Sequence, residues 1–500
     1  MKVIFRVDAS IWIGSGHVMR CLVLADALKN VAADVSFACL PQHGDMIAYI
    51  EQRGHSVTKM TPVLSPVTPV DDADYLGWLQ RSVDEDASDF ISKIQQAEIV
   101  VTDHYAIGRE WQQKIKAALQ CKIVAIDDLV RLHDADCIID QTLGRKAEEY
   151  FNNTTILAGT DYALLAESFS HYRTLAISKS SPKAIPKVLV SMGGVDAPNG
   201  TLMVLKSLVG KVDAIFTVLL SPRAPHYQEV VAWCDRHGSV THVGFCDNMA
   251  LLMLDHDIAI GAPGSTSWER ACLGLPSIII PLAANQKTIT TQLVNHRAVI
   301  TLELNEIRQK IIHAFQMLLS DWETYHKVNL ALCDGKGVKR VVLSLQQQAK
   351  AIEHCDFELT LATSADIKVV YDWQCHPKTR QYALNTAVPT WDEHLSWMVR
   401  KLTCPEDYFY IIRHRLSKQP CGVLRLDKQK DKNYLVSIFV NPEQYGIGVA
   451  SSALLLADFI HPNVTLHATV LENNQASQQL FIKAHYLRVS TEQFIRFPIK

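Results

Sequence analysis

Long apolar runs, paired cysteines and an excess of one charge are all missing from this chain of 500 residues. No stretch approaches the roughly 18 consecutive apolar residues that a membrane-spanning helix needs. Lys and Arg total 49 against 52 Asp and Glu, so the net charge of −3 gives no bulk attraction to nucleic acid or to anionic membranes. We therefore expect neither nucleic acid nor a membrane among its partners.

The twelve cysteines are scattered singly, without a CxxC pair and without the Cys/His spacing of a zinc site. This pattern predicts free thiols and no bound metal. The opening sequence MKVIFRVDAS has no apolar stretch of signal-peptide length, because Arg6 and Asp8 interrupt it. Together these features predict a cytoplasmic protein, and they leave its oligomeric state open.

With hydrophobic residues at 48% and charged residues at 20%, the composition is that of a globular protein with about three folding units. Short β-branched runs alternate with helical patterns over the first two thirds, as in α/β proteins whose parallel sheet is covered on both faces. A polar Ser/Pro-rich break at 176–187 separates two such series, which predicts doubly wound, Rossmann-like lobes over 1–175 and 176–345. Strands are predicted at 2–9, 33–40, 98–105, 122–129 and 135–142, then at 187–194, 213–221, 240–245, 256–263 and 276–282.

After a predicted linker at 346–356 the pattern changes, and residues 357–500 are expected to form a smaller α+β domain. Three antiparallel-looking strands follow one another at 408–415, 421–428 and 433–440. A helical pattern near 448–459 and a further strand at 464–470 come next.

The first turn of interest, Gly14-Ser15-Gly16-His17, joins a predicted strand to a predicted helix. Glycines let backbone approach a ligand, and a helix start offers free N–H groups to phosphate. The positive end of the helix dipole favours the neutral imidazole of His17, which suits a general base. Asp8, at the end of the preceding strand, would orient His17 or the sugar. The same residues would also serve as an ordinary connection with a capping histidine.

Two further turns belong to the second predicted lobe. Gly193 and Gly194 directly follow a strand and suit close backbone approach to a diphosphate, although a simple turn explains them equally well. The third turn is more specific, because donors at a helix start are followed one turn later by a carboxylate that could accept both ribose hydroxyls. Its residues are Gly264, Ser265, Thr266 and Glu269, with Asn285 and Gln286 expected to close the next turn over the same cleft.

Five segments, taken in order, resemble the UDP-sugar hydrolases of pseudaminic acid biosynthesis: FRVDASIWIGSGHVMRCLVLADAL, VVTDHY, AIDD, VLVSMGGVD and GAPGSTSWERACLGLPSIIIPLAANQ. The resemblance covers roughly residues 1–345. That family releases UDP from UDP-2,4-diacetamido-2,4,6-trideoxy-β-L-altropyranose, and it is similar to the GT-B glycosyltransferase that makes peptidoglycan lipid II. The resemblance therefore implies GT-B-like lobes and a UDP-sugar substrate.

By this resemblance, His17 is the base that activates water for attack at the anomeric carbon, with UDP leaving and the configuration inverting. Glu269 would bind the ribose. Ser265, Thr266 and the turn at 193–194 would hold uracil and phosphates, and no metal is implied.

Residues 357–500 resemble the GNAT acetyltransferase superfamily, which implies acetyl-CoA as cosubstrate. The segment NPEQYGIGVASSAL lies where that fold binds pyrophosphate through backbone N–H groups, and VLENNQASQQLFIKAHY matches a later motif. Phe481 replaces the tyrosine that commonly protonates the departing thiolate, and phenylalanine cannot donate a proton. The residues expected at acetyl-CoA are Val440, Tyr445 (in place of the usual Arg/Gln), Gly446, Gly448, Ala450, Asn474 and Ser477.

The leading hypothesis is a bifunctional enzyme that acetylates the 4-amino group of a UDP-sugar and then removes UDP. One alternative is a GT-B glycosyltransferase with an acceptor other than water. Another is a UDP-sugar-binding protein whose C-terminal domain has lost catalysis, which Tyr445 and Phe481 would permit.

Overall fold

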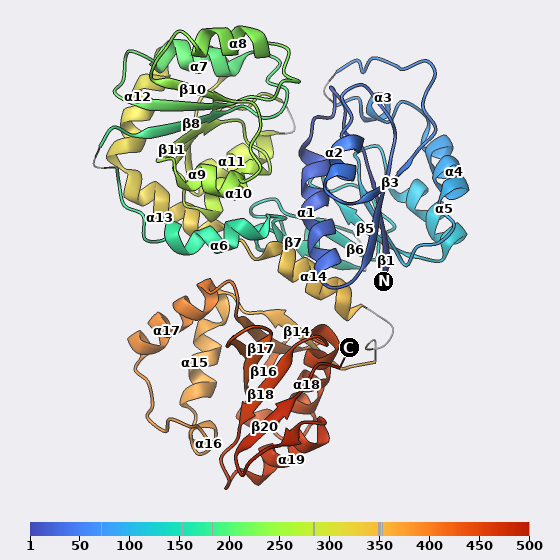
Figure 1. Ribbon diagram of the computed structural model, residues 1–500, viewed down its shortest axis with the longest axis vertical. Coiled ribbons are helices and arrows are strands. Elements are labelled where there is room, and N and C mark those ends of the chain that lie inside the picture. The colour runs from blue at the N-terminus through green and yellow to red at the C-terminus, as the bar shows by residue number, and fades with distance from the viewer. Residues whose placement is uncertain are drawn as a thin grey trace. The chain divides into compact units, whose positions relative to one another are not determined.

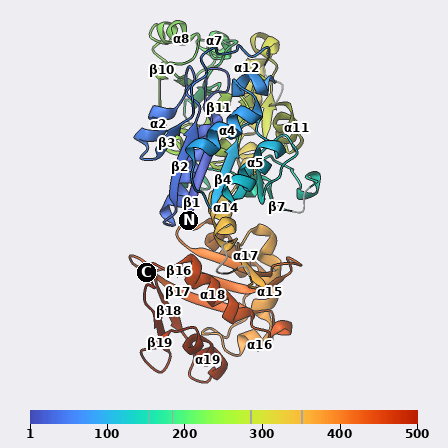
Figure 2. The same cartoon turned by 90° about the vertical axis from the view of Figure 1, so that its right-hand side faces the viewer.

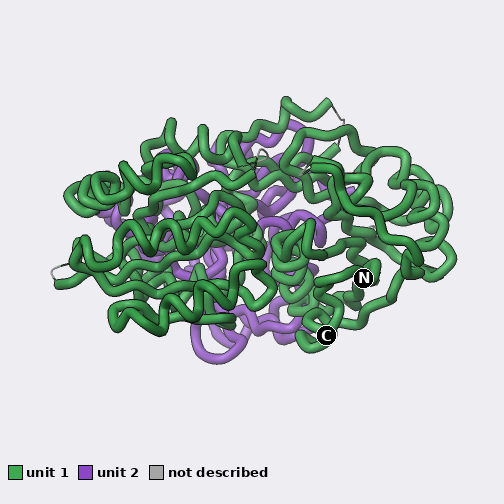
Figure 3. Tube along the Cα trace, turned by 90° about the horizontal axis from the view of Figure 1, so that it is seen from above, with its two compact units in different colours: residues 1–339 green, residues 340–500 purple. Residues whose placement is uncertain are grey.

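A computed structural model describes residues 1–71, 73–151, 154–182, 184–283, 286–348, 352 and 354–499. The chain divides into two compact units, residues 1–339 and 340–500 (Figure 3). Unit 1 holds two parallel-sheet lobes and unit 2 holds a mixed sheet, so the predicted fold class is confirmed. The limits proposed for the individual domains stay predictions.

The first lobe is a seven-stranded parallel sheet in the order β3-β2-β1-β4-β5-β6-β7 (Figure 1). Its central strands are buried on both faces, as their apolar sequences predict. The strands are β1 (Lys2–Val7), β2 (Asp34–Cys39), β3 (Ser56–Lys59), β4 (Ile99–Asp103), β5 (Lys122–Ile126), β6 (Cys137–Asp140) and β7 (Thr155–Ala158). The helices are α1 (Gly16–Asn30), α2 (Ile47–Gln52), α3 (Tyr75–Leu79), α4 (Val83–Lys93) and α5 (Arg109–Leu119). The helix that follows, α6 (Glu167–Ala176), packs in a core of the second lobe.

The second lobe is a six-stranded parallel sheet in the order β10-β9-β8-β11-β12-β13. Helices α7 and α12 pack on one core of this lobe, and α9, α10 and α13 on another. The strands are β8 (Lys187–Ser191), β9 (Ile215–Leu219), β10 (Val240–Val243), β11 (Ile258–Gly261), β12 (Ser277–Ile279) and β13 (Val299–Thr301). The helices are α7 (Gly200–Leu208), α8 (Tyr227–Cys234), α9 (Met249–Leu254), α10 (Thr266–Cys272), α11 (Lys287–Asn295), α12 (Ile307–Ser320) and α13 (Trp322–Leu332). The next helix, α14 (Gly337–Gln347), crosses the division between the units, and its Leu343 belongs to a core of unit 2.

Each parallel sheet has one point at which the strand order reverses. In the first lobe β2 and β3 lie on one side of β1, and the chain then crosses to β4 on the other side. In the second lobe the same reversal lies between β8 and β11. Open α/β sheets bind ligands outside the carboxyl ends of the strands at such switch points. The fold therefore predicts functional residues at two positions: after β1 and β4 in the first lobe, and after β8 and β11 in the second.

Unit 2 is a seven-stranded sheet in the order β14-β15-β16-β17-β18-β20-β19, in which only the β17–β18 pair is parallel. Helices α18 and α19 pack on one hydrophobic core, and α15 and α17 on the other. Figures 1 and 2 both show α19 beside the β19–β20 end of the sheet. The strands are β14 (Phe357–Leu361), β15 (Tyr408–His414), β16 (Pro420–Lys428), β17 (Asn433–Val440), β18 (Thr465–Thr469), β19 (Leu487–Arg488) and β20 (Gln493–Arg496), and the helices are α15 (Ile367–Cys375), α16 (Pro377–Arg380), α17 (Trp391–Thr403), α18 (Val449–Ile460) and α19 (Gln475–Lys483).

The segment predicted as a linker is attached to unit 2. Arg415 donates hydrogen bonds to the backbone oxygens of Gln347 (3.1 Å), Ile352 (3.3 Å) and Cys355 (3.0 Å). The side chain of Ile352 also belongs to the α18 core. The division into compact units accordingly falls at residues 339 and 340, before the predicted linker.

Candidate active site

His17 lies in the first turn of α1, directly outside the switch point of the first lobe, and its residue exposure is only 9%. Its Nδ1 is 2.5 Å from Oδ1 of Asp103, the last residue of β4. A carboxylate only accepts hydrogen bonds, so this short contact favours the imidazole proton on Nδ1, although Nη2 of Arg20 also lies 3.3 Å from that nitrogen. The other ring nitrogen, Nε2, is left with the lone pair that a base needs.

Asp103 is held in turn by Arg20, one helical turn after His17. The Arg20 guanidinium donates from Nε to Oδ2 (2.6 Å) and from Nη2 to Oδ1 (2.7 Å). Burial alone would raise the pKa of the Asp103 carboxyl, but Arg20 and His17 lower it well below its usual range. Asp103 is therefore an anion at neutral pH. Sequence analysis missed both residues, although VVTDHY contains Asp103, because a contact between residues 86 positions apart leaves no local pattern.

The expectation that Asp8 orients His17 is not met, because Asp103 occupies that position. Asp8 is buried after β1, and its Oδ1 accepts from Arg6 Nη1 (2.6 Å) and from the backbone N–H of Leu40 (2.7 Å). Two donors of its own lobe thus fix this carboxylate. Its Oδ2 has no hydrogen-bond partner, so a contact with the sugar stays a prediction.

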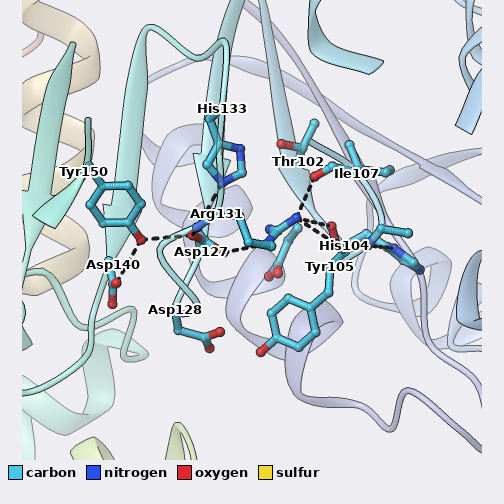
Figure 4. A network of polar contacts seen from close by, with 12 residues as sticks. Thr102, His104, Tyr105, Ile107, Asp127, Asp128, Arg131, His133, Asp140 and Tyr150 are labelled. Carbon is cyan, nitrogen blue, oxygen red and sulfur yellow. Dashed lines mark hydrogen bonds and ion pairs between the residues drawn. The ribbon is translucent and has the colours of Figure 1, made fainter. Parts of the chain in front are cut away.

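A polar network fixes the segment that follows β4, which packs against His17. The Tyr105 ring meets the His17 ring edge-on, with 4.8 Å between centroids. Arg131 donates to the backbone oxygens of Tyr105 and Ile107 (both 2.8 Å), and Asp127 anchors Arg131 through Nε (2.8 Å), as Figure 4 shows. Asp127 of the AIDD motif therefore positions, through Arg131, the backbone that packs beside His17.

In the second lobe, the predicted glycine turn follows β8 at the switch point. Gly193 has φ +89°, a backbone conformation that favours glycine. A Cβ added at Gly194 would lie 3.2 Å from Ser15 Oγ of the first lobe. Unit 1 thus brings the GSGH turn and the GG turn together, although they are far apart in sequence.

The third turn follows β11, across the switch point from β8. A Cβ added at Gly264 would meet nothing within 4 Å, and Ser265 and Thr266 begin α10. The N–H of Gly264 donates to Ser267 Oγ (3.2 Å), so it is already partly engaged. Glu269 lies one turn into the same helix.

Glu269 is a half-buried residue, and among the described residues only Arg270 acts on its carboxyl as a neighbouring cation. Its Oε2 has no hydrogen-bond partner, and burial raises its pKa to about 7. The neighbouring Arg270 donates instead to Ala262 O (3.0 Å) and Ser267 Oγ (3.2 Å). A buried polar atom without a partner is costly unless a ligand completes it.

The predicted pair after β12 is only half described. Asn285 lies outside the described residues. Gln286 is the N-cap residue of α11, and its Oε1 accepts from the backbone N–H of Leu282 (2.8 Å). Its carbonyl therefore stabilises the turn of its own loop.

In unit 2 the predicted phosphate loop has the backbone that such a loop needs. Gly446 and Gly448 have φ +84° and +88°, and a Cβ at either would meet nothing within 4 Å. Tyr445 is 49% exposed, and Ala450 lies in the first turn of α18. Strand β17 pairs with the parallel strand β18 only as far as Val436. Beyond Val436, up to Val440, it pairs with β16 alone, so β17 and β18 separate over this stretch.

The later motif is structural at two of its positions. Asn474 caps α19, with its Oδ1 accepting from the N–H of Ser477 (3.1 Å). Phe481 is buried against Tyr486 and Phe494, with centroids 5.0 and 6.0 Å away. The expected proton donor is thus replaced by a core residue.

Within the described part of the chain, no three His, Cys, Asp or Glu side chains come together as metal ligands. None of the helices among the described residues combines the length and the apolar character needed to cross a membrane.

Comparison with known proteins supports the division into different modules. Residues 203–339 match the glycosyltransferase family 28 C-terminal domain, and residues 356–486 match the acetyltransferase (GNAT) domain. The calicheamicin glycosyltransferase CalG4 superimposes with a TM-score of 0.50 at 11% identity, covering 70% of this chain and 99% of that protein. At that identity the likeness concerns the fold alone.

Among curated proteins, the UDP-2,4-diacetamido-2,4,6-trideoxy-beta-L-altropyranose hydrolase of Campylobacter jejuni is 26% identical over 59% of this chain and 96% of its own length. An uncharacterized protein of Methanocaldococcus jannaschii is 23% identical over 96% of both chains. The spore coat polysaccharide biosynthesis protein SpsG of Bacillus subtilis is 24% identical over 51% of this chain and 78% of its own. The chain thus carries a GNAT acetyltransferase domain behind a region homologous to a UDP-sugar hydrolase.

Proposed function

For a chain that joins GT-B-like lobes to a GNAT domain, we propose a bifunctional nucleotide-sugar enzyme of pseudaminic acid biosynthesis. Unit 1 hydrolyses UDP-2,4-diacetamido-2,4,6-trideoxy-β-L-altropyranose to UDP and the free sugar. The observation that carries this proposal is the Asp103–His17 contact at the switch point, because it leaves Nε2 of His17 as a proton acceptor. The homology to the Campylobacter jejuni hydrolase supports the choice of substrate.

In the proposed reaction, His17 Nε2 takes a proton from water while the water oxygen bonds to the anomeric carbon. The bond between that carbon and the UDP oxygen breaks, and UDP leaves with the electron pair. Asp103 stabilises the imidazolium that forms, because the carboxylate already accepts from Nδ1. Attack from the face opposite UDP inverts the configuration.

UDP is proposed to bind at the second-lobe switch point. Ionised Glu269 would accept both ribose hydroxyls, which would complete its unpartnered Oε2. Gly264 and Gly194 do not have a positive φ, so their backbone conformations do not require glycine. Their lack of a side chain supports close approach of the diphosphate and uracil, which would also contact Ser265 and Thr266. The turns around Gly14 and Gly193 complete the proposed contacts, with Gln286 in the adjoining loop, and Asn285 stays a proposal from the sequence alone.

Unit 2 is proposed to acetylate the 4-amino group of the UDP-sugar precursor with acetyl-CoA. The loop at Gly446 and Gly448 and the separation of β17 from β18 near Val440 support binding of acetyl-CoA there. No disulfide joins the described cysteines, which supports a cytoplasmic location.

The test follows both steps with the full chain in ¹⁸O-labelled water. The 2,4-diacetamido UDP-sugar should release UDP with ¹⁸O in the free sugar. His17→Ala should lower this rate by roughly 10²- to 10⁴-fold, the usual worth of a general base. It should leave the affinity for UDP within about twofold, because Nε2 serves the reaction rather than binding. The 4-amino UDP-sugar should release UDP only after acetyl-CoA is added, with free CoA appearing first.

The outcomes separate the alternatives. Label in UDP would mean attack at phosphorus and would exclude the mechanism. Equal loss of UDP binding and rate in His17→Ala would make His17 a ligand contact. The match to a glycosyltransferase domain favours a second candidate, a UDP-sugar glycosyltransferase, and UDP binding without release into water would support it. Acetyl-CoA binding without acetyl transfer would restrict unit 2 to a binding role.

A further inference from the structure

Arg223 connects the two lobes of unit 1 outside the residues assigned so far, in addition to the edge-on contact of the Tyr49 and Phe245 rings (5.8 Å between centroids). Arg223 lies in the loop after β9 of the second lobe. Its guanidinium points at the first lobe, where Nη2 donates to the backbone oxygen of Asp45 (3.3 Å) and Nη1 lies 3.5 Å from that of Gly44. Both oxygens belong to the loop that precedes α2.

On the first-lobe side, this loop supports the turn that carries His17. The backbone oxygen of His43 accepts from the N–H of Ile11 (3.0 Å). Gly44 has φ +80°, and a Cβ there would lie 2.9 Å from Ile11 Cγ2. Ile11 begins the loop closed by the hydrogen bond from Gly14 N–H to Ser10 O (2.9 Å). Two residues after Gly14, α1 begins with His17 in its first turn.

On the second-lobe side, the loop of Arg223 is joined to the GG turn. His226 Nε2 lies 3.0 Å from the backbone oxygen of Ala197. Asp196, beside Ala197, accepts from the N–H groups of Gly200 (2.8 Å) and Thr201 (2.9 Å) at the start of α7. These contacts tie the loop of Arg223 to the segment that continues from Gly193 and Gly194.

We propose that Arg223 is a positioning residue that couples ligand binding at the second-lobe turn to the placement of His17. It touches no reacting atom. A diphosphate at the GG turn would fix residues 193–197, and through His226 and Arg223 it would fix the loops at 43–45 and 10–14. The kinetic part of this inference rests on the proposed hydrolase, whereas the coupling itself does not.

The coupling is tested by hydrogen exchange in the full chain, with UDP as the probe. Arg223→Ala should speed amide exchange in peptides covering 10–16 and 43–47 of the free protein by roughly threefold or more, because local opening becomes easier. In the unmodified protein, UDP should slow exchange at 43–47, which holds none of the proposed UDP contacts, and Arg223→Ala should remove that effect while UDP still protects 193–201. Arg236→Ala, an exposed arginine of the same lobe, is the matched control and should change neither.

The kinetic readout separates positioning from binding. Arg223→Ala should lower kcat for UDP release by roughly three- to tenfold, the worth of about one hydrogen bond. The Kd for UDP should move less than about twofold, and Arg223→Lys should fall between the two proteins. Unchanged exchange at 43–47 in the free variant, or full UDP protection of 43–47 without Arg223, overturns the inference. Absence of UDP binding to the unmodified protein would refute the proposed function instead, while the free-protein comparison still decides whether Arg223 holds the loops.

Discussion

The two switch points of unit 1 solve different problems with different residues. The edge after β1 and β4 is built from charges, with His17 and Arg20 on Asp103. The edge after β8 and β11 presents bare backbone at Gly194 and Gly264, with the Glu269 carboxylate behind them. Its other charges, Asp196 and Arg270, are already hydrogen-bonded within the same lobe. The difference teaches that the first edge suits proton transfer and the second suits binding. Breaking each edge should therefore produce a different defect.

The largest effect is expected at the charged edge. Asp103→Asn keeps the shape of the side chain but allows its amide to donate toward His17, which favours the wrong tautomer. We expect kcat for UDP release to fall by roughly 10²- to 10⁴-fold, as for other histidine bases that lose their orienting carboxylate. The Kd for UDP, measured by calorimetry, should stay within about threefold, because binding belongs to the other edge.

Asp26→Asn is the matched control for that variant. Asp26 also lies in α1 and pairs with a histidine and an arginine, since it is 2.6 Å from His55 Nε2 and 2.5 Å from Arg53 Nη2. That cluster is part-exposed and away from the switch point, so its loss should leave kcat nearly unchanged. Thermal unfolding of both variants separates lost orientation from lost stability, because removing one partner of a buried pair costs about 3–5 kcal/mol. If Asp103→Asn folds and keeps a normal kcat, the first edge does not serve proton transfer, and the proposed difference between the two edges is wrong.

The sequence predicts the residues of the second edge better than those of the first. Strand-to-helix alternation predicts both lobes, and the turns at Gly14–His17, Gly193–Gly194 and Gly264–Glu269 are visible as local patterns. The partner of His17 is not, because only the parallel pairing of β1 with β4 brings Asp103 beside α1. Asp8 directly follows β1, so the sequence suggests it as the partner of His17, whereas the actual partner, Asp103, ends the neighbouring strand β4.

The strands that were not predicted have a related explanation. β3, β7, β13 and β19 lie at sheet edges, and β19 and β20 have only two and four residues. An edge strand is buried against one neighbour only, so it needs less apolar sequence. In contrast, the sequence over 305–350 has the pattern of one helical stretch, and the structure divides it into α12, α13 and α14 because the chain breaks briefly at Asp321 and near Gly335.

A middle-sized effect is expected at the glycine edge. Gly264→Ala adds a Cβ in open space at a residue without positive φ, so the fold should be unchanged or stabilised by about 0.4–1 kcal/mol. The Kd for UDP should rise by about tenfold if the diphosphate approaches this backbone, which corresponds to about 1.4 kcal/mol. Calorimetry and thermal unfolding report the two quantities separately.

Gly261→Ala provides the opposite case on the same strand-to-helix connection. A Cβ there would lie 2.1 Å from Ser191 O, so something must shift. Overpacking of this kind destabilises by about 1–3 kcal/mol, so the melting temperature should fall whatever happens to binding. Weak UDP binding in Gly264→Ala together with an equally lowered melting temperature would make Gly264 a structural glycine as well.

The smallest effect concerns Glu269, whose Oε2 is the unpartnered carboxylate oxygen at the glycine edge. It is measured with uridine because uridine carries no phosphate that titrates near neutral pH. Burial raises the pKa of Glu269 to about 7, so the carboxyl is mostly protonated at pH 6 and mostly ionised at pH 8. Only the ionised form accepts both ribose hydroxyls with both oxygens. Uridine affinity should therefore rise with pH and level off above about 7, by roughly three- to tenfold in all, because one proton allows at most tenfold per pH unit. Glu269→Gln should bind more weakly at pH 8 and show no such rise, whereas His17→Ala should keep the full pH dependence, since the titrating group belongs to the second edge. The same rise in Glu269→Gln would assign the titration to another group and would leave the second edge without a charge that senses the ligand.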